Sequence, residues 1–236
     1  MAFGVVQFPG TNCDHDCFHV VHDVLEQETF FLWHGDHALP SEFTNNPEKS
    51  VIILPGGFSY GDYLRCGSLA SHSPLIKNIK EFAGSGGRII GICNGFQILA
   101  EAGMLPGTLI MNTTLRFICK NVYLKVINND SPFTSKYQIN EVINMPIAHK
   151  EGSFYIEDEG LERLRENGQI AFHYCNVNGE VSPESNPNGS VDNIAGIFNK
   201  DKNVLGMMPH PERLSEKLFI DRIDGILLFK SLVTTK

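Results

Sequence analysis

Short apolar runs alternate with amphipathic stretches through the first hundred residues of the chain. The runs are rich in β-branched and aromatic residues and are bounded by turn-forming residues, which is typical of buried strands. We expect four strands here, at 3–8, 30–34, 51–54 and 88–92. Between them, apolar spacing predicts helices over 14–27 and 75–83. This alternation predicts an α/β fold with a largely parallel sheet, in which ligands bind beyond the carboxyl ends of the strands.

The second half of the chain has a more antiparallel character. Its turns are rich in Asn, Gly, Pro and Ser, as in 176–190. Strands are expected at 115–126, 170–175, 194–198 and 204–208. Apolar spacing also predicts a closing helix over 221–232. Because no internal repeat and no long linker interrupts the pattern, we expect residues 1–236 to form a single domain.

Composition narrows the classes of function. The 236 residues are 42% hydrophobic, which suffices for one substantial core. The net charge is −8 and no cluster of lysine and arginine forms a stripe, so nucleic-acid binding is not expected. No apolar run reaches membrane-spanning length, and Met1–Phe8 lacks the pattern of a signal peptide. The six cysteines are therefore expected to be free thiols in a reducing, cytoplasmic setting.

One cysteine stands where nucleophiles are often found. Cys93 lies between the expected strand 88–92 and an expected helix over 94–102, in the sequence Gly-Ile-Cys-Asn-Gly. Such an elbow exposes a nucleophile at the carboxyl edge of a sheet, and the amide of Asn94 is then free to hold an oxyanion. A helix N-terminus also favours a thiolate. The alternative is a small buried thiol that simply packs well.

A thiol nucleophile needs a base, and the base needs an orienting group. His210 and Glu212 follow the expected strand 204–208, and on an extended segment residues two apart point the same way. Pro209 and Pro211 stiffen the segment. Glu212 could therefore orient His210 toward a thiol. The alternative is a surface loop with a chance His and Glu.

The turn Pro55-Gly56-Gly57 ends another expected strand. Glycines let a backbone amide approach a ligand closely, so the amide of Gly57 could join that of Asn94 in an oxyanion hole. The alternative is an ordinary strand-ending turn.

These three elements, in this order, resemble the class I (triad) glutamine amidotransferases. Within them, the chain is similar to the glutaminase subunits of phosphoribosylformylglycinamidine synthase, of the small, separate-subunit type. The resemblance covers essentially the whole length and rests on five segments, 7–14, 57–65, 146–152, 186–190 and 206–213.

The resemblance implies a three-layer, flavodoxin-like fold, with a largely parallel sheet, flanking helices and extra antiparallel strands. It implies that Cys93 attacks the side-chain carboxamide of glutamine, that His210 transfers the proton, and that Glu212 holds His210 in the required tautomer. Gln97 occupies the position that commonly contacts the substrate glutamine. Its alternative is a polar residue on the surface of an amphipathic helix.

The resemblance also implies partners. Ammonia would pass to a synthetase subunit that uses ATP to convert formylglycinamide ribonucleotide to formylglycinamidine ribonucleotide in purine biosynthesis, and a small accessory subunit would complete the complex. ATP and Mg are expected on the synthetase partner. No cofactor is expected in this chain, which contains no phosphate-cradling loop.

Two other classes of protein deserve comparison. Cysteine hydrolases and chaperone-like proteins of the same superfamily typically place His directly after the nucleophile, whereas Asn94 follows Cys93 here. A non-catalytic binding subunit would be indicated by loss of a triad member, and Cys93, His210 and Glu212 are all present. Fold alone would not separate these classes.

Some weaker signals remain open. The segment 13–22 is rich in Cys and His, but structural zinc sites usually draw paired ligands from more than one element, so we expect no metal there. His149 and Glu151 could line the glutamine site or the ammonia exit, or stabilise a loop. Arg65 could anchor a carboxylate of a ligand or form an ion pair at the surface.

Overall fold

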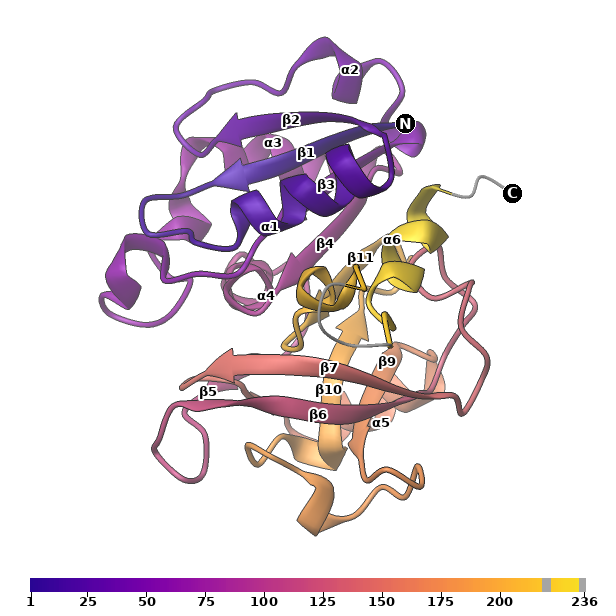
Figure 1. The fold of residues 1–236 in the computed structure, drawn as a ribbon. Coiled ribbons are helices and arrows are strands. Elements are labelled where there is room, and N and C mark those ends of the chain that lie inside the picture. The colour runs from indigo at the N-terminus through magenta and orange to yellow at the C-terminus, as the bar shows by residue number, and fades with distance from the viewer. Residues whose placement is uncertain (218–221, 234–236) are drawn as a thin grey trace.

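The computed structural model describes residues 1–217 and 222–233. Within them one mixed sheet of nine strands runs in the order β2-β1-β3-β4-β11-β10-β9-β6-β7 (Figure 1). In that order the strands are β2 (Glu28–Trp33), β1 (Ala2–Gln7), β3 (Ser50–Leu54), β4 (Arg88–Ile92), β11 (Val204–Met207), β10 (Ile194–Phe198), β9 (Ile170–Cys175), β6 (Ile118–Val126) and β7 (Val142–His149). A second, two-stranded sheet pairs β5 (Thr108–Ile110) with β8 (Ser153–Tyr155).

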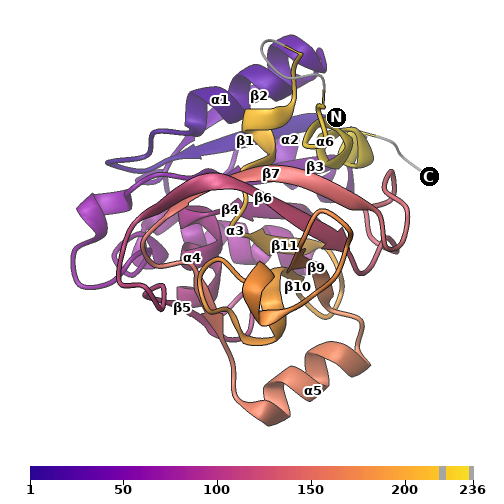
Figure 2. The same ribbon diagram turned by 60° about the horizontal axis from the view of Figure 1, so that its bottom comes forward.

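The sheet changes character at β11. The pairings from β2 to β11 are parallel, and those from β11 to β7 are antiparallel. β11 is therefore parallel to β4 on one side and antiparallel to β10 on the other. This strand joins the two halves of the chain, and the long β6–β7 pair arches across the second half (Figure 2).

Helices flank the sheet. They are α1 (Asp14–His19), α2 (Ser41–Thr44), α3 (Pro74–Gly84), α4 (Asn94–Glu101), α5 (Asp158–Glu166) and α6 (Ile226–Val233). α1 and α3 cover opposite faces of the parallel half (Figure 1). Strand β3 is consequently buried on both faces, which explains why its sequence is continuously apolar instead of alternating. None of the described helices is long and apolar enough to cross a membrane.

Several predicted boundaries shift in the structure. The expected helix 14–27 is shorter, because α1 passes into a single π-helical turn that ends at Val24. The expected strand 115–126 begins only at Ile118, since Leu115 has a positive φ of 57°. The expected closing helix is found as α6, but its expected first residue, Asp221, lies outside the described residues.

The sequence pattern does not predict β5, β7, β8 or α5. The most consequential omission is β7, which contains His149 where a loop was one of the expectations. Its residues alternate between partly and fully buried, because one face packs on the core and the other is only partly covered.

The elbow before α4 depends on close packing. Cys93 has φ 51° and ψ −103°, and α4 begins directly after it. A Cβ on Gly95 would overlap the carbonyl oxygen of Leu54 at the end of β3, so only glycine lets the helix lie this close to the strand. Packing between β3 and α4 thus holds the elbow in its strained conformation.

We expect Gly95→Ala to lower the free energy of unfolding by about 1–3 kcal/mol, because the new methyl group must displace a strand carbonyl or the whole helix. Gly84→Ala is the matched control. It lies in α3 with nothing within 4 Å of the added Cβ, and it should be neutral or stabilising by up to about 1 kcal/mol. Denaturant unfolding of both variants measures the difference, and equal stabilities would show that the helix is not held as described.

Candidate active site

Cys93 lies at the carboxyl end of β4, at the centre of the sheet. Its amide donates a hydrogen bond to the carbonyl of Met207 at 2.8 Å, which ties the elbow to the end of β11. Its thiol is 3.7 Å from the carbonyl oxygen of Ala148 on β7. A positive φ at a non-glycine residue costs on the order of 1–3 kcal/mol and persists where packing enforces it. The expected strand-to-helix elbow is therefore present.

A cavity of about 260 Å³ lies beside the elbow. This volume is below the range of about 300–1,000 Å³ typical of sites for drug-sized ligands, and it suits a ligand the size of an amino acid. Eleven residues line it: Gly57, Phe58, Asp62, Cys66, Cys93, Gln97, Phe117, Ala148, His149, Lys150 and Glu151.

His210 and Glu212 form a buried pair. His210 Nδ1 lies 2.6 Å from Glu212 Oε1, and the two residues are 2% and 5% exposed. The amide of His210 donates to the carbonyl of Pro146 on β7 at 2.8 Å. The expected contact between His210 and Glu212 is present. The expectation that an extended segment would bring the two side chains together is wrong. β11 ends at Met207 and Glu212 lies in a 3₁₀ turn, Pro211–Leu214, which brings the carboxylate back to the ring.

The charge environment favours protonation of His210. Burial opposes the charged ring, but the negative charges of Glu212 and Cys93, together with the contact to Cys13, outweigh burial. The pKa of His210 therefore lies well above its usual value. Its Nε2 is buried and has no hydrogen-bond partner among the described residues. The ring thus carries one nitrogen committed to Glu212 and one left for another group.

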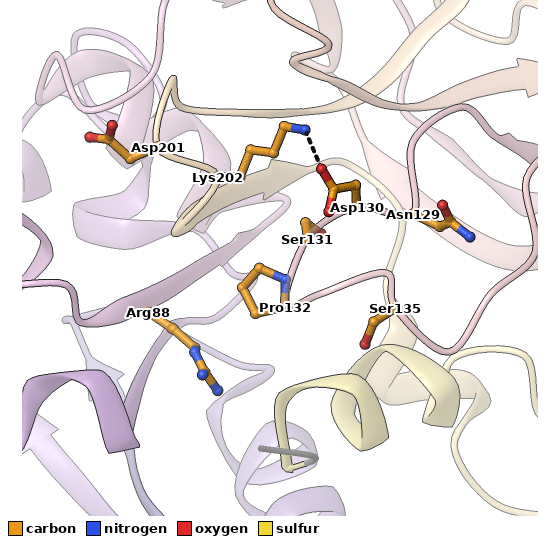
Figure 3. A pocket seen from close by; sticks show the side chains of 8 residues that line it. All are labelled: Arg88, Asn129, Asp130, Ser131, Pro132, Ser135, Asp201 and Lys202. Carbon is orange, nitrogen blue, oxygen red and sulfur yellow. Dashed lines mark hydrogen bonds and ion pairs between the residues drawn. The ribbon is translucent and has the colours of Figure 1, made fainter. Parts of the chain in front are cut away.

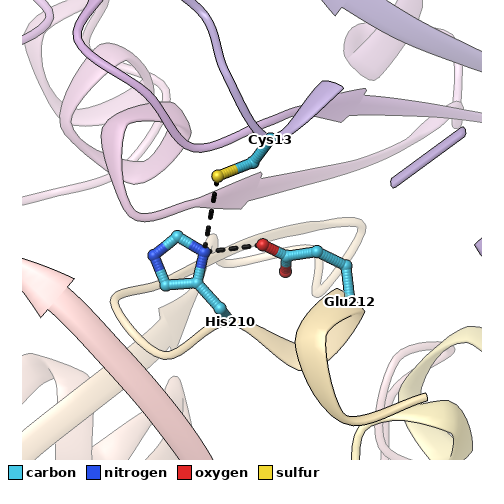
Figure 4. A group of neighbouring side chains, drawn as sticks. All are labelled: Cys13, His210 and Glu212. Carbon is cyan, nitrogen blue, oxygen red and sulfur yellow. Dashed lines mark hydrogen bonds and ion pairs between the residues drawn. The ribbon is translucent and has the colours of Figure 1, made fainter. Parts of the chain in front are cut away.

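A second thiol, Cys13, lies near the same ring nitrogen of His210 that contacts Glu212 (Figure 4). Its Sγ is 3.9 Å from His210 Nδ1, and Arg213 donates a hydrogen bond to it at 3.2 Å. Arg213 also forms an ion pair with Asp16 at 3.1 Å. This contact joins the start of α1 to the C-terminal segment. The sequence gives no sign of it, because 197 positions separate the two partners.

Gly56 and Gly57 have different roles. A Cβ on Gly56 would lie 2.7 Å from His210 Cε1 and 3.1 Å from Cys13 Sγ, so this glycine leaves room for the imidazole. Gly57 has φ +151° and lines the cavity, and a Cβ there would lie 2.7 Å from Thr11 Cα. It therefore lets the turn pass close to the β1–α1 loop.

Asn94 and Gln97 belong to one hydrogen-bond chain. Asn94 accepts from the amide of Ser59 at 3.1 Å and donates to Gln97 Oε1 at 2.8 Å. Gln97 then donates to the carbonyl of Glu151 at 2.6 Å. The chain links the loop after β3, the start of α4 and the end of β7. The main-chain amide of Asn94 is among the first of α4, where no acceptor exists within the helix.

His149 is buried beside the cavity in one fixed tautomer. Asn112 Nδ2 donates to two carbonyls, those of Arg116 and His149, which leaves Asn112 Oδ1 to accept from His149 Nδ1 at 3.1 Å. Nε2 is then an acceptor, and it has no partner among the described residues. Burial, reinforced by the charge of nearby His210, lowers the pKa of His149 to about 4.

Arg65, whose role the sequence left open, forms an ion pair with Glu101 and a hydrogen bond to Thr108 Oγ1 at 3.3 Å. Glu151 lines the cavity, and its main-chain carbonyl accepts a hydrogen bond from Gln97.

The side chains of the Cys- and His-rich segment 13–22 have different surroundings in the structure. Cys17 packs in the core, whereas His19 pairs with Asp23 and Glu216.

A larger hollow, of about 380 Å³, lies at the amino edge of the sheet (Figure 3). Lys202 and Asp130 form an ion pair across it at 3.4 Å, and Arg88 donates to the carbonyl of Leu232. Arg88, Asp130 and Lys202 are thus engaged with the chain itself. None of the residues that line it is a cysteine or histidine, so the chemistry expected of a thiol and its base belongs to the smaller cavity.

Comparison with known proteins agrees with this geometry. A family model of the CobB/CobQ-like glutamine amidotransferase domain matches residues 2–226. A chain in the structure of PurLQS from Thermotoga maritima is 40% identical, with a TM-score of 0.83 over 98% of this chain and 97% of that one. The fold is thus that of a class I glutamine amidotransferase. A glutamine amidotransferase from Thermotoga maritima at 14% identity and a TM-score of 0.58 shares the fold alone.

Curated relatives narrow the family. The phosphoribosylformylglycinamidine synthase subunit PurQ of Aquifex aeolicus is 50% identical, covering 99% of this chain and all of its own. The subunit of the same name from Salinibacter ruber is 49% identical, covering 98% of this chain and 95% of its own. The chain belongs to the PurQ family of glutamine amidotransferase subunits. The resemblance seen in the motifs and the expected α/β fold with added antiparallel strands are both confirmed.

The lowered pKa of His149 predicts a loss of stability in acid. The folded pKa, about 4, lies below the ordinary value of 6.5, so the unfolded chain binds more protons between these pH values. This difference in pKa contributes about 3 kcal/mol to the free energy of unfolding. The contribution is fully present above pH 6.5 and is lost as the pH falls toward 4. His149→Gln cannot titrate and should lose less stability than the parent between pH 7 and 4.5. Denaturant unfolding at each pH measures this, with exposed His37→Gln as the matched control.

We expect no stoichiometric metal in the purified protein. The donor atoms of Cys13, His210 and Glu212 do lie within 4.8 Å of one another, a combination that the sequence did not indicate. However, the guanidinium of Arg213 lies against Cys13 and 3.8 Å from Glu212, which supplies the positive charge that a metal ion would bring. Elemental analysis tests this. About one zinc per chain, abolished by Cys13→Ser, would contradict it.

Proposed function

We propose that the chain hydrolyses glutamine to glutamate and ammonia through Cys93, His210 and Glu212. The observation that carries the proposal is the position of His210. One ring nitrogen is bound to a buried carboxylate at 2.6 Å, and the ring interacts electrostatically with a thiol at a strand-to-helix elbow. The elbow opens on a cavity suited to an amino acid. This arrangement supports nucleophilic attack on an amide by an activated thiol.

In the first half of the reaction Cys93 Sγ, deprotonated by His210, attacks the carbon of the side-chain carboxamide. The oxygen of that group becomes an oxyanion, which the main-chain amides of Asn94 and Gly57 stabilise. His210 then donates its proton to the nitrogen as the carbon–nitrogen bond breaks. The products of this half are ammonia and a glutamyl thioester on Cys93.

In the second half water attacks the thioester. His210 accepts a proton from the water, the carbon–sulfur bond breaks, and the thiolate of Cys93 is restored with glutamate as product. Glu212 accepts a hydrogen bond from Nδ1 throughout, which directs Nε2 toward the reaction and stabilises the imidazolium. Gln97 and Asn94 keep the loop after β3 and the end of β7 at fixed positions around the substrate.

The ammonia serves a partner. The relatives of this chain are named as subunits of phosphoribosylformylglycinamidine synthase. The solved structure from Thermotoga maritima is named PurLQS, and this name includes L and S components beside Q. The partner we propose is a synthetase subunit, with a small accessory subunit, that forms formylglycinamidine ribonucleotide from formylglycinamide ribonucleotide. ATP and Mg bind to that partner. Residues 1–236 act as a single glutaminase domain without a cofactor of their own, in the cytoplasm.

The rival activities fit less well. In the hydrolase and chaperone-like arrangement the residue after the nucleophile is a histidine, whereas the side chain of Asn94 is committed to Ser59 and Gln97. A binding subunit without catalysis would not need a carboxylate buried against a histidine, since burying such a pair is costly in free energy.

Cys93→Ala should lower glutamine hydrolysis by several orders of magnitude, because the elbow loses its thiol and Cys66, the other thiol in the cavity, has a raised pKa. The assembled complex should still use added ammonia, since the thiol serves only ammonia release. Glutamate formation and ammonia-dependent synthesis measure the two activities. Cys175→Ala is the matched control. Its thiol lies on β9, where burial raises its pKa to about 11, and both activities should be retained. Near-normal glutaminase activity of Cys93→Ala would refute the proposed function.

A further inference from the structure

The loop after β3 places a carboxylate in the wall of the cavity that contains Cys93. Asp62, half-buried, lines this cavity together with Cys66 and Glu151. Its Oδ1 is buried and has no hydrogen-bond partner among the described residues. Burial raises the pKa of Asp62 and the charge of Glu151 adds to this, although a hydrogen bond from the Cys66 thiol partly offsets the rise, as expected of a carboxylate without a cation beside it.

In the described part of the chain, no cation lies against Asp62. Arg65, three positions further on, is engaged with Glu101 and Thr108. His149 is neutral, because its pKa is about 4. Lys150 lines the cavity but is exposed, where its charge is well solvated and suits the carboxylate of a bound amino acid. Cys66 lies against Asp62 and Glu151, and burial and their negative charges raise its pKa, so it stays a neutral thiol.

A second group in the same wall also lacks a hydrogen-bond donor. His149 is 3% exposed, its tautomer is set by Asn112, and its Nε2 is an acceptor without a partner in the described part of the chain. This wall of the cavity thus offers acceptors, in Asp62, Glu151 and His149. The elbow on the other side offers the free amides of the first turn of α4. A cavity polarised in this way suits a ligand with an N–H-rich cationic group at one end and a carbonyl at the other.

We propose that Asp62 binds the α-ammonium group of free glutamine and is the residue that restricts the site to the free amino acid. The proposal rests on the proposed glutaminase function. With its carboxamide carbon at Cys93, glutamine carries its ammonium group four bonds away, within the same small cavity. The ammonium then satisfies the buried oxygen of Asp62.

Asp62 is favoured over Glu151 for two reasons. Only Asp62 has a buried carboxylate oxygen that lacks a partner in the described cavity wall. Its backbone is also held in place, with positive φ at Tyr60 and Asp62, while the Tyr60 hydroxyl contacts His34 Nδ1 at 2.9 Å. The carboxylate is thereby positioned before the substrate arrives, which reduces the entropy lost on binding.

The test compares two substrates in the assembled complex. One is glutamine and the other is 5-amino-5-oxopentanoate, which is glutamine without its α-ammonium group. Asp62→Asn should raise the KM for glutamine about 10–100-fold with kcat changed less than about threefold, because a hydrogen bond between two charged groups is lost. The KM for the analogue, which the parent already binds weakly, should change less than about threefold. Release of ammonia measures both.

Two variants serve as comparisons. Asp201→Asn makes the same chemical change at an exposed site in the turn between β10 and β11, and should leave the KM for both substrates unchanged. Glu151→Gln should raise the KM for glutamine less than Asp62→Asn does. Alkylation of Cys93 by iodoacetamide, which has no ammonium group, should proceed at the parent's rate in Asp62→Asn, showing that the elbow is intact.

The outcomes separate the two proposals. If Asp62→Asn raised the KM for glutamine and for the analogue by the same factor, or lowered kcat for both, Asp62 would act through the loop and the assignment would be wrong. An unchanged KM for glutamine would also overturn it. Neither result affects the role of Cys93. Conversely, glutamine hydrolysis by Cys93→Ala would overturn the glutaminase function itself, whatever the effect at Asp62.

Discussion

The contact between Gly95 and the carbonyl of Leu54 is the constraint on which the site depends. It lets α4 start directly at the end of β4 and keeps Cys93 at a positive φ that its side chain would otherwise avoid. The same approach fixes the orientation of the first amides of α4. A thiol, a helix N-terminus and the turn after β3 are therefore positioned together by one close packing between a helix and its neighbouring strand.

The strand that joins the two halves of the sheet positions both Cys93 and the segment that carries His210. β11 pairs with β4 in parallel, and its last residue, Met207, accepts the hydrogen bond from the amide of Cys93. The chain then turns past β7, where Pro146 accepts from His210. The antiparallel half is thus more than an extension of the sheet, because β7 supports the base and contributes His149 and Ala148 to the cavity.

The sequence predicted the parallel half well, because β1, β3 and β4 are buried on both faces and have continuous apolar sequences. It predicted Cys93, His210 and Glu212 through local motifs, and the structure brings His210 to Glu212. β7 was missed because Asn144 and Pro146 interrupt its apolar sequence. The proximity of Cys13 to His210 and the unpartnered oxygen of Asp62 arise only from tertiary packing, so no local pattern could indicate them.

The bond between Arg213 and Cys13 has a consequence for how the protein matures. It links the first turn of α1 to the segment that carries the base, so the two ends of the chain must meet before His210 acquires its surroundings. During synthesis the elbow with its thiol can form well before that segment leaves the ribosome, since domains are made from the N-terminus onward. A growing chain therefore contains Cys93 before His210 and Glu212 have been made, so the proposed reactivity toward glutamine must wait for that later segment.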